Sequence, residues 1–487
     1  MNMARTAIID IGSNSVRLVI YDGVEEIENI KVFAQLRRHL NANGMIDPKG
    51  VESLIKTLKE FSVVIGFYQV EHILCGATAT VRQARNKKDI QLQVKKQTGL
   101  TIQIISEYEE AFYGCHAILN SSPLVDGYTI DLGGGSTEVT FVKNRKLVEY
   151  NSFPFGAVSL KQQFIKGNFP TLGEIQEISN FLQQQLTSIP WIKKNHYPIF
   201  AIGGSARNLV RAHQGLISYP LLGEHLYKMD LADLDHVQKH LCGGTFLDLL
   251  RVEGIVKGRA DTIIPAIQVF IELGRLLDTK AFYLSKKGFR DGLVANDKMI
   301  LPIGDIRKKS IRQLAPPSFL SKEAAQLCTQ LNINDETYEL LEYGLSLYNI
   351  GSKICSSDTL AHSFYLVANR ALDGFTHKER VALALLASYH SKGRFKKHLE
   401  PYVPWFTKEE RQQLQILGAI IKFVNAMDLQ EKSVVEQIQL FENTADQLCL
   451  FLLMKNDFPH KKEELLKQKK HLERALKKDI HLEFSKI

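Results

Sequence analysis

The sequence predicts an α/β protein in which two related lobes share a cleft, followed by an all-α region. Three observations support this fold class. A strand that ends in aspartate, a turn of small residues and a returning strand occur twice, around Asp10 and around Asp131. After about residue 301 the strand signals give way to helical patterns. The chain has 487 residues, which is too many for one ordinary core, so we expect two to four domains.

The first turn follows an apolar strand at residues 6–10 and precedes another at 16–22. Its small polar residues are Ser13, Asn14 and Ser15. A turn of this kind after a buried strand is usually structural. A second copy 121 residues later is harder to explain in that way. The pair therefore predicts a duplicated fold in which each lobe offers a phosphate loop to a shared cleft.

Between the two turns, strand patterns alternate with helical ones, which is typical of an α/β lobe. Asp47 is the expected N-cap of the first helix, with Pro48 at its first position, and Ser106 is expected to cap the last. The expected order is helix 48–67, a strand at 70–77 that leads into the segment 78–82, helix 86–97, strand 101–105 and a helix after 106.

The second turn is rich in glycine and has an acid at each edge, Asp131 and Glu138. Successive glycines let backbone N–H groups approach an anion closely. The acids would repel bare phosphate, so the pattern makes sense if Mg²⁺ lies between carboxylate and phosphate oxygens. A tight structural hairpin is the alternative. The candidate metal ligands are Asp10, Asp131 and Glu138, and the candidate phosphate-binding residues of this turn are Gly133, Gly134, Gly135 and Ser136.

A third turn, at Gly203, Gly204 and Ser205, follows an expected strand at 197–202 and opens a helix at 206–212. A helix N-terminus behind a Gly-Gly turn can bind an anion or a ribose, although close strand–helix packing explains it equally well. Upstream, Thr171 and Glu174 form the pattern of a capping box for a helix through 186. A strand at 281–284 and a helix at 289–300 are expected to complete the second lobe.

Prolines and glycine at residues 302–317 indicate a linker, after which helical patterns follow one another. We therefore predict an all-α third domain. Its expected helices span 321–331, 336–348, 360–372, 378–390, 409–423 and 433–441.

The composition, 45% hydrophobic and 23% charged, is ordinary for a globular protein. The six cysteines are scattered without a CxxC pair, which favours reduced core thiols. We expect a cytoplasmic protein without a membrane partner, because neither a signal-peptide pattern nor an apolar run of spanning length is evident. The net charge of +8 favours a polyanionic partner. The lysines at 461–478 alternate with glutamates and indicate a solvated helix face.

The three turns, in this order, resemble those of the actin-like superfamily and, more closely, those of the exopolyphosphatase/guanosine pentaphosphate phosphatase family. Segments 77–82, 106–111 and 288–293 also match that family. The resemblance covers residues 5–300 strongly, and the helical region is similar in placement to the family's HD-like domain. It implies two actin-like (ribonuclease H-like) lobes flanking a cleft, at 1–122 and 123–302, and an all-α HD-like domain at 303–487.

The resemblance also implies a reaction, Mg²⁺-dependent hydrolysis of a terminal phosphoanhydride. Glu110 matches the family's catalytic glutamate, which activates water, and Arg82 matches a phosphate-contacting arginine. Asp131 and Glu138 match acids near the metal and the water. Without the resemblance, the residues favour a different interpretation, in which Glu110 is a surface acid in the first turn of a helix and Arg82 is a surface residue. The family further implies a homodimer formed through the helical region.

The HD-like region departs from the family pattern, because the His-Asp step falls on Tyr348-Asn349. Tyrosine cannot replace an imidazole ligand here, and asparagine is a poor substitute for a carboxylate. His362 and His390 remain, but isolated histidines on helices are commonly structural. We predict that the helical domain carries no catalytic metal and acts as a binding or dimer-forming extension.

The first functional hypothesis is an exopolyphosphatase that removes orthophosphate from the end of inorganic polyphosphate. Basic residues of the helical domain could then line a channel for the rest of the polymer, among them Lys392, Arg394, Lys396, Lys397 and His398. The second is hydrolysis of the 5′-γ-phosphate of guanosine pentaphosphate (pppGpp), which the loops do not distinguish because they bind phosphate rather than base. The third is an actin-like ATPase or kinase, or a non-catalytic phosphate sensor. No nucleic-acid polymer is expected as a partner.

Overall fold

The computed structural model describes residues 5–23, 25–295, 299–355, 357–444 and 446–486. The chain divides into two compact units, and each is described by itself. The first combines Met1–Tyr219 with Glu224–Leu301, and the second combines Pro220–Gly223 with Pro302–Ile487.

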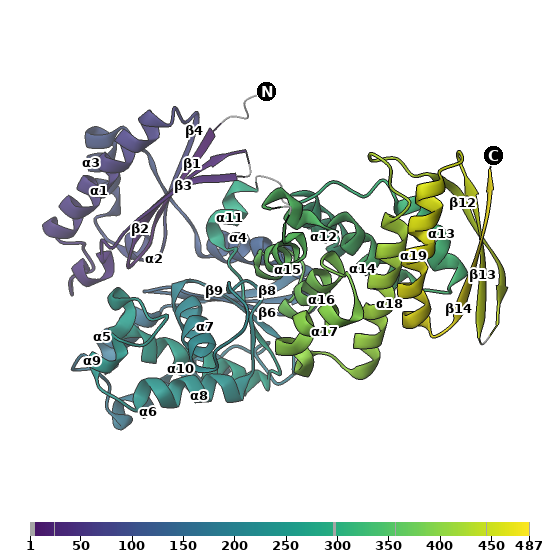
Figure 1. Ribbon diagram of the computed structural model, residues 1–487. Helices are drawn as coiled ribbons and strands as arrows, with labels where there is room; N and C mark the ends of the chain where they lie inside the picture. Colours follow the sequence, from purple (N-terminus) through teal and green to yellow (C-terminus); the bar gives the residue numbers. More distant parts are fainter. Residues whose placement is uncertain (1–4, 24, 296–298, 356, 445, 487) are drawn as a thin grey trace. The chain divides into compact units, whose positions relative to one another are not determined.

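The first unit begins with a sheet of strand order β3-β2-β1-β4-β5, which with its helices is called lobe I (Figure 1). Strand β1 (Arg5–Ile11) runs antiparallel to β2 (Val16–Asp22) and parallel to β4 (His72–Ala77). The other elements of lobe I are β3 (Glu25–Val32), η1 (Leu36–His39), α1 (Pro48–Phe67), α2 (Ala79–Gln83), α3 (Lys87–Thr98) and β5 (Ile102–Ile104).

The expected elements of lobe I are present, and the strand predicted at 70–77 is β4. Strand β4 ends at Ala77, where its neighbours β1 and β5 also end. With no partner strand left to supply hydrogen bonds, the chain turns into α2. The expected helix starts are confirmed: Asp47 accepts the Gly50 N–H at 2.8 Å, and Ser106 forms a capping box with Glu109.

Lobe II is built on a sheet of order β10-β11-β9-β6-β7-β8 that repeats the plan of lobe I. Strand β6 (Gly127–Leu132) runs antiparallel to β7 (Thr137–Lys143) and parallel to β9 (Ile199–Ile202), as β1 does to β2 and β4. The predicted duplication is therefore confirmed. The other elements are β8 (Lys146–Phe153), α5 (Ala157–Phe164), α6 (Leu172–Thr187), α7 (Gly204–Leu216), β10 (Lys228–Met229), α8 (Leu231–Cys242), α9 (Phe246–Leu249), η2 (Lys257–Thr262), α10 (Ile263–Leu277) and β11 (Phe282–Leu284).

The two lobes exchange a helix. Helix α11 (Phe289–Val294) lies against the lobe I sheet, and α4 (Glu107–Leu119) lies against the lobe II sheet. The two helices also pack on each other, and a Cβ at Gly292 would lie 2.1 Å from the Tyr113 carbonyl oxygen. Only glycine permits so close a crossing. The predicted helix 289–300 was too long, since α11 ends at Val294; residues 296–298 lie outside the described residues.

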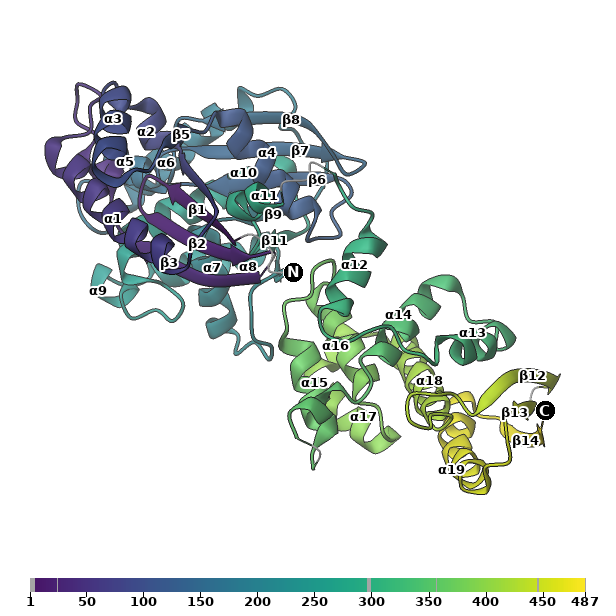
Figure 2. The same cartoon turned by 90° about the horizontal axis from the view of Figure 1, so that it is seen from above.

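The second unit is mainly helical, as predicted, and Figure 2 shows its helices beside a small sheet. One helix, α12 (Ile303–Arg312), occupies the predicted linker, so that part of the prediction was wrong. Pro302 immediately precedes α12, a position where proline costs no helical hydrogen bond. The other helices are α13 (Ser321–Gln330), α14 (Asp335–Ser346), η3 (Ile350–Lys353), α15 (Thr359–Asn369), α16 (His377–Ala387), α17 (Lys392–Leu399), η4 (Glu400–Trp405), α18 (Lys408–Asn425) and α19 (Pro459–Leu476).

The all-α prediction needs correction at the C-terminal end, where strands form a sheet of order β12-β13-β14. The predicted helix 433–441 is instead part of β12 (Val435–Asn443), which pairs with β13 (Gln447–Met454), and β14 (Asp479–Lys486) completes the sheet. In β13 every second residue is buried, which is the strand period rather than the helical one. Among the described residues, no helix combines the length and apolar character needed to cross a membrane.

Candidate active site

The turns after β1 and β6 close in the same way. The Gly12 N–H donates to the Ser15 carbonyl at 3.0 Å, and the Gly133 N–H donates to the Ser136 carbonyl at 3.0 Å. A Cβ at Gly12 or Gly133 would approach that carbonyl oxygen to 3.1 or 3.0 Å. A larger residue would have to displace that carbonyl by a few tenths of an ångström, so the geometry favours glycine at the same place in both turns.

The two turns lie against each other. A Cβ at Gly134 would lie 3.1 Å from the Ser13 Cβ, and one at Gly135 would lie 3.0 Å from the Ser13 Oγ. Beside them, the Ala157 N–H at the start of α5 donates to the Gly133 carbonyl at 3.0 Å, and the next amide donates to the Gly134 carbonyl. The first amides of α5 thus form hydrogen bonds with two carbonyl oxygens of the glycine turn. Without these bonds, the partial negative charge of the two oxygens would repel an anion at the turn.

Both turns line one cavity of about 190 Å³, together with the third glycine turn. The structure thus brings most of the predicted site residues together at a common crevice. Those that line the cavity are Asp10, Ser13, Asn14, Ser15, Glu110, Asp131, Gly133, Gly134, Ser136, Gly203 and Gly204. The predicted residues that are not part of its lining are Arg82, Gly135, Glu138 and Ser205.

Two acids of the cavity have raised pKa values. Burial raises the pKa of Glu110 to about 7; the guanidinium of Arg82 opposes the shift, while Asp131 and Asp10 add to it. Burial and the neighbouring Asp10 raise the pKa of Asp131 to about 6. A carboxylate with a pKa near 7 can accept a proton at neutral pH, which is what general-base catalysis requires.

Arg82 holds Glu110 in place. Its Nη1 donates to Glu110 Oε2 at 2.8 Å and to the Ile105 carbonyl at 2.9 Å. Arg82 thus orients the Glu110 carboxylate without lining the cavity itself. A contact between Arg82 and phosphate stays a prediction.

Glu138 is buried beside the cavity rather than in its lining. Its Oε1 accepts a hydrogen bond from the Ser152 hydroxyl at 3.0 Å. Burial, followed by the charges of Glu110 and Asp131, raises its pKa well above the ordinary value. A raised pKa favours the neutral carboxyl, which is a poor cation ligand. The predicted roles of Glu138 in catalysis and metal binding stay predictions. Ser205, at the third turn, accepts a hydrogen bond from Arg259 Nη1 at 3.2 Å.

The cavity offers oxygen ligands of the kind that Mg²⁺ prefers, from Asp10 and Asp131. Within the described ranges, no cluster of three acidic, histidine or cysteine side chains could hold a metal alone. Mg²⁺ commonly binds through one or two carboxylates, with substrate phosphates and water completing its octahedron. The residues present fit that mode of binding.

Cationic side chains complete the lining, and sequence reasoning gave none of them a role. They are Arg17, Lys31, Arg207, Arg259, Lys286 and Arg290. Burial lowers the pKa of Arg17 and of Arg259 to about 10. Burial and the surrounding arginines, Arg259 first, lower the pKa of Lys31 to about 7.

Two of these cations have a recognisable sequence context. Arg17 is the one charged residue in the stretch 16–21, and Arg290 belongs to a family-like segment. Lys31 and Arg259 had no local signal, because only the tertiary fold brings their segments to the cavity.

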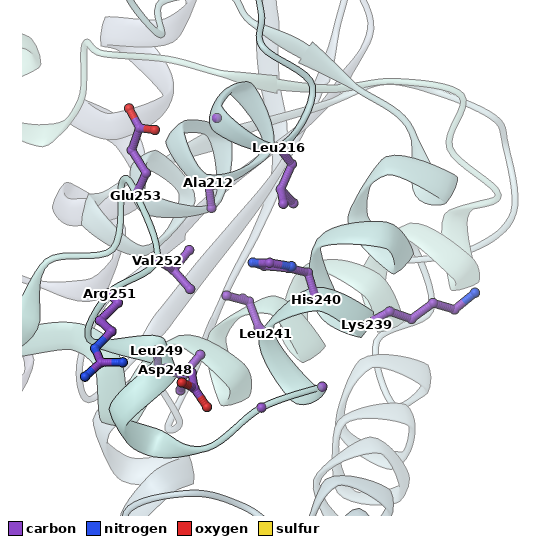
Figure 3. Close-up of a pocket in the computed structure, with 13 residues that line it drawn as sticks. Ala212, Leu216, Lys239, His240, Leu241, Asp248, Leu249, Arg251, Val252 and Glu253 are labelled. Carbon is purple, nitrogen blue, oxygen red and sulfur yellow. The ribbon is translucent and has the colours of Figure 1, made fainter.

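A larger hollow of about 680 Å³ lies elsewhere on lobe II (Figure 3). It is formed by the C-terminal ends of α7 and α8 and the chain after α9, and the His240 ring extends into it. Its lining includes neither the glycine turns nor the acids described above. Size alone therefore does not identify the candidate site.

Comparison with known proteins agrees with this arrangement. The sequence model of the Ppx/GppA phosphatase family matches residues 4–299, and that of Ppx/GppA phosphatase domain III matches residues 310–475. The chain is similar to the crystal structure of an exopolyphosphatase from Cytophaga hutchinsonii, with 22% identity and a TM-score of 0.55 over 60% of this chain and 97% of that one. It is also similar to the Aquifex aeolicus member of the Ppx/GppA family, with 28% identity and a TM-score of 0.53 over 60% and 97% of the two chains. The predicted actin-like fold is confirmed.

Proposed function

Because the chain belongs to the Ppx/GppA phosphatase family, we propose that it is an exopolyphosphatase that releases orthophosphate from the end of inorganic polyphosphate. The charge of the cleft carries this proposal. Among the described residues, six cationic and three acidic side chains line the cavity. Such an excess of cations suits a substrate that carries a negative charge on every unit.

The size of the cavity supports cleavage at the end of the polymer. At about 190 Å³ it is smaller than the roughly 300–1,000 Å³ of pockets that enclose a whole ligand. Only the end of an anionic polymer fits inside, while the remainder extends away from the glycine turns. Phe289 supplies the one aromatic ring among the described lining residues, so the cavity has little to stack against a nucleobase.

In the proposed reaction, the small-residue turns of both lobes hold the terminal phosphate. Glu110 accepts a proton from a water molecule, whose oxygen forms a bond to the terminal phosphorus. The bond from that phosphorus to the bridging oxygen breaks, and the shortened polymer leaves with the bridging oxygen. Arg82 keeps the Glu110 carboxylate aimed. Positioning and charge neutralisation account for most of the catalysis in such transfers.

Asp10 and Asp131 are the residues that would hold Mg²⁺. When bound, the ion would neutralise charge on the substrate's phosphate oxygens. Removing it with a chelator should abolish phosphate release, and added Mg²⁺ should restore it.

The competing substrate is pppGpp, which also ends in a phosphoanhydride. Orthophosphate release from long-chain polyphosphate, pppGpp and ATP should be measured at equal concentrations of terminal phosphate. We expect the highest kcat/KM with polyphosphate. Faster release from pppGpp or ATP, or no release from polyphosphate, would contradict the proposal.

A further inference from the structure

An ion pair connects the two lobes beside the cavity. Arg38 Nη2, in η1 of lobe I, donates to Asp261 Oδ2, in η2 of lobe II, at 2.7 Å. A second contact lies nearby, where a Cβ at Gly258 would lie 3.5 Å from the Phe33 ring. The segment from β3 to η1 in lobe I is therefore fastened to η2 in lobe II.

The same two segments carry cations of the cavity. Lys31 lies on β3 and Arg259 on η2, and both line the cavity with Arg17 of lobe I and Arg207 of lobe II. The closed arrangement thus brings like charges from opposite lobes together. Their repulsion favours separation of the lobes unless an anion lies between them or another contact holds them.

Asp261 is placed to provide that contact. Its side chain is only 14% exposed, and Lys161 Nζ of α5 approaches its Oδ2 to 3.5 Å. Lys161 fixes the carboxylate within lobe II, and Arg38 reaches it from lobe I. A carboxylate fixed in this way loses less side-chain freedom when it forms the ion pair than a fully exposed one would.

We propose that Arg38 and Asp261 are positioning residues whose ion pair holds the lobes closed, so that the cations of both lobes contact one anionic substrate. The proposal rests on the proposed function, because it assigns the residue pair a role in binding that substrate. Neither residue lines the cavity, so the pair acts through Lys31 and Arg259 rather than on the reacting atoms.

The test compares Arg38→Gln, Asp261→Asn and the double variant, with long-chain polyphosphate as substrate. The pair is present both before and during the reaction, so its loss should raise KM and leave kcat within about twofold. We expect each single change to raise KM about two- to fivefold, the range for a partly exposed ion pair. The KM of the double variant should not exceed the higher KM of the two single variants, because each single change already removes the whole ion pair.

A matched control is Lys194→Gln, which removes an ion pair of 2.8 Å between Lys194 and Asp278 within lobe II. It should leave KM unchanged. Hydrogen exchange measured without substrate gives a readout independent of turnover. Exchange in residues 33–40 and 256–262 should increase in both Arg38→Gln and Asp261→Asn and stay unchanged in Lys194→Gln.

The outcomes separate the two proposals. If Arg38→Gln and Asp261→Asn keep the wild-type KM, or if their effects add in the double variant, the positioning role is wrong while the proposed function stands. If the wild-type protein neither cleaves nor binds long-chain polyphosphate, the proposed function fails, and the role of the pair in substrate binding fails with it.

Discussion

Asp10 and Asp131 occupy matching positions in two hairpins, but their cross-strand neighbours carry opposite charges. In the first hairpin Asp10 pairs across the strands with Arg17, and in the second Asp131 pairs with Glu138. Residues directly opposite in an antiparallel pair point to the same face. The duplicated hairpin thus places a cation beside one aspartate and an acid beside the other. The lobe I hairpin contributes a cation to the lining of the cavity, and the lobe II hairpin contributes to the acid cluster around Glu110.

Glu110 is expected to be the general base. Replacing it in Glu110→Gln should lower phosphate release about 10²- to 10⁴-fold, the usual contribution of a positioned base. Binding of tripolyphosphate should change little, because the cations of the cavity remain. The control is Glu109→Gln, since Glu109 is engaged in the capping box at Ser106 and glutamine can replace it there. A Glu110→Gln variant with wild-type turnover would exclude this mechanism.

Glu138 should make stability depend on pH. Its folded-state pKa lies above the ordinary value of 4.5, so the unfolded chain ionises first as pH rises, and stability is lost above that value. Glu138→Gln removes this loss. Its Tm should match that of the wild type near pH 4 and exceed it increasingly toward pH 8, as measured by thermal melts. A Tm difference that stays constant with pH would show that Glu138 is charged in the folded protein.

Arg259 should bind substrate chiefly through its charge. Arg259→Gln should raise the KM for long polyphosphate about tenfold and reduce the dependence of binding on salt, because fewer counterions are released. Lys257→Gln is the control, since Lys257 is exposed two residues away and does not line the cavity. The measurement is KM over a series of salt concentrations. Equal slopes in the two variants would remove Arg259 from the proposed binding site.

Gly156 should be required for the shape of the glycine turn. A Cβ at Gly156 would lie 2.6 Å from the Gly133 carbonyl oxygen and 2.7 Å from the Gly135 nitrogen. Gly156→Ala should therefore destabilise the protein by about 1–3 kcal/mol, as overpacking does, and lower activity. Gly66→Ala in α1 is the control, because nothing lies within 4 Å of its Cβ position, and it should be neutral or stabilising. Denaturant unfolding measures both, and equal stabilities would show that the turn tolerates the extra atom.

Local patterns in the sequence predicted the parts of the fold that local chemistry determines. The two aspartate turns and the caps at Asp47, Ser106 and Thr171 were found because turn and cap residues are set by their immediate neighbours. Helix α12 was missed because the prolines on either side of it, Pro302, Pro316 and Pro317, were interpreted as a linker. Strand β12 was missed because its pairing with β13, rather than local propensity, decides its structure.

The residues of the candidate site were also predicted only in part. Its acids and turn residues lie in recognisable segments and were predicted. Lys31 and Arg259 come from segments with no local signal, and the exchange of α4 and α11 between the lobes is visible only in three dimensions. The Arg38–Asp261 pair spans 223 residues of sequence, and no pattern in one sequence links its members.

We expect the turns of both lobes to hold the same terminal phosphate. A crystal structure of the Glu110→Gln variant soaked with tripolyphosphate and Mg²⁺ would reveal this arrangement. A terminal phosphate should lie between residues 12–15 and 133–136, with the next phosphates near Arg17, Lys31 and Arg259. A tripolyphosphate bound away from either turn, with the cavity between them empty, would overturn the proposal.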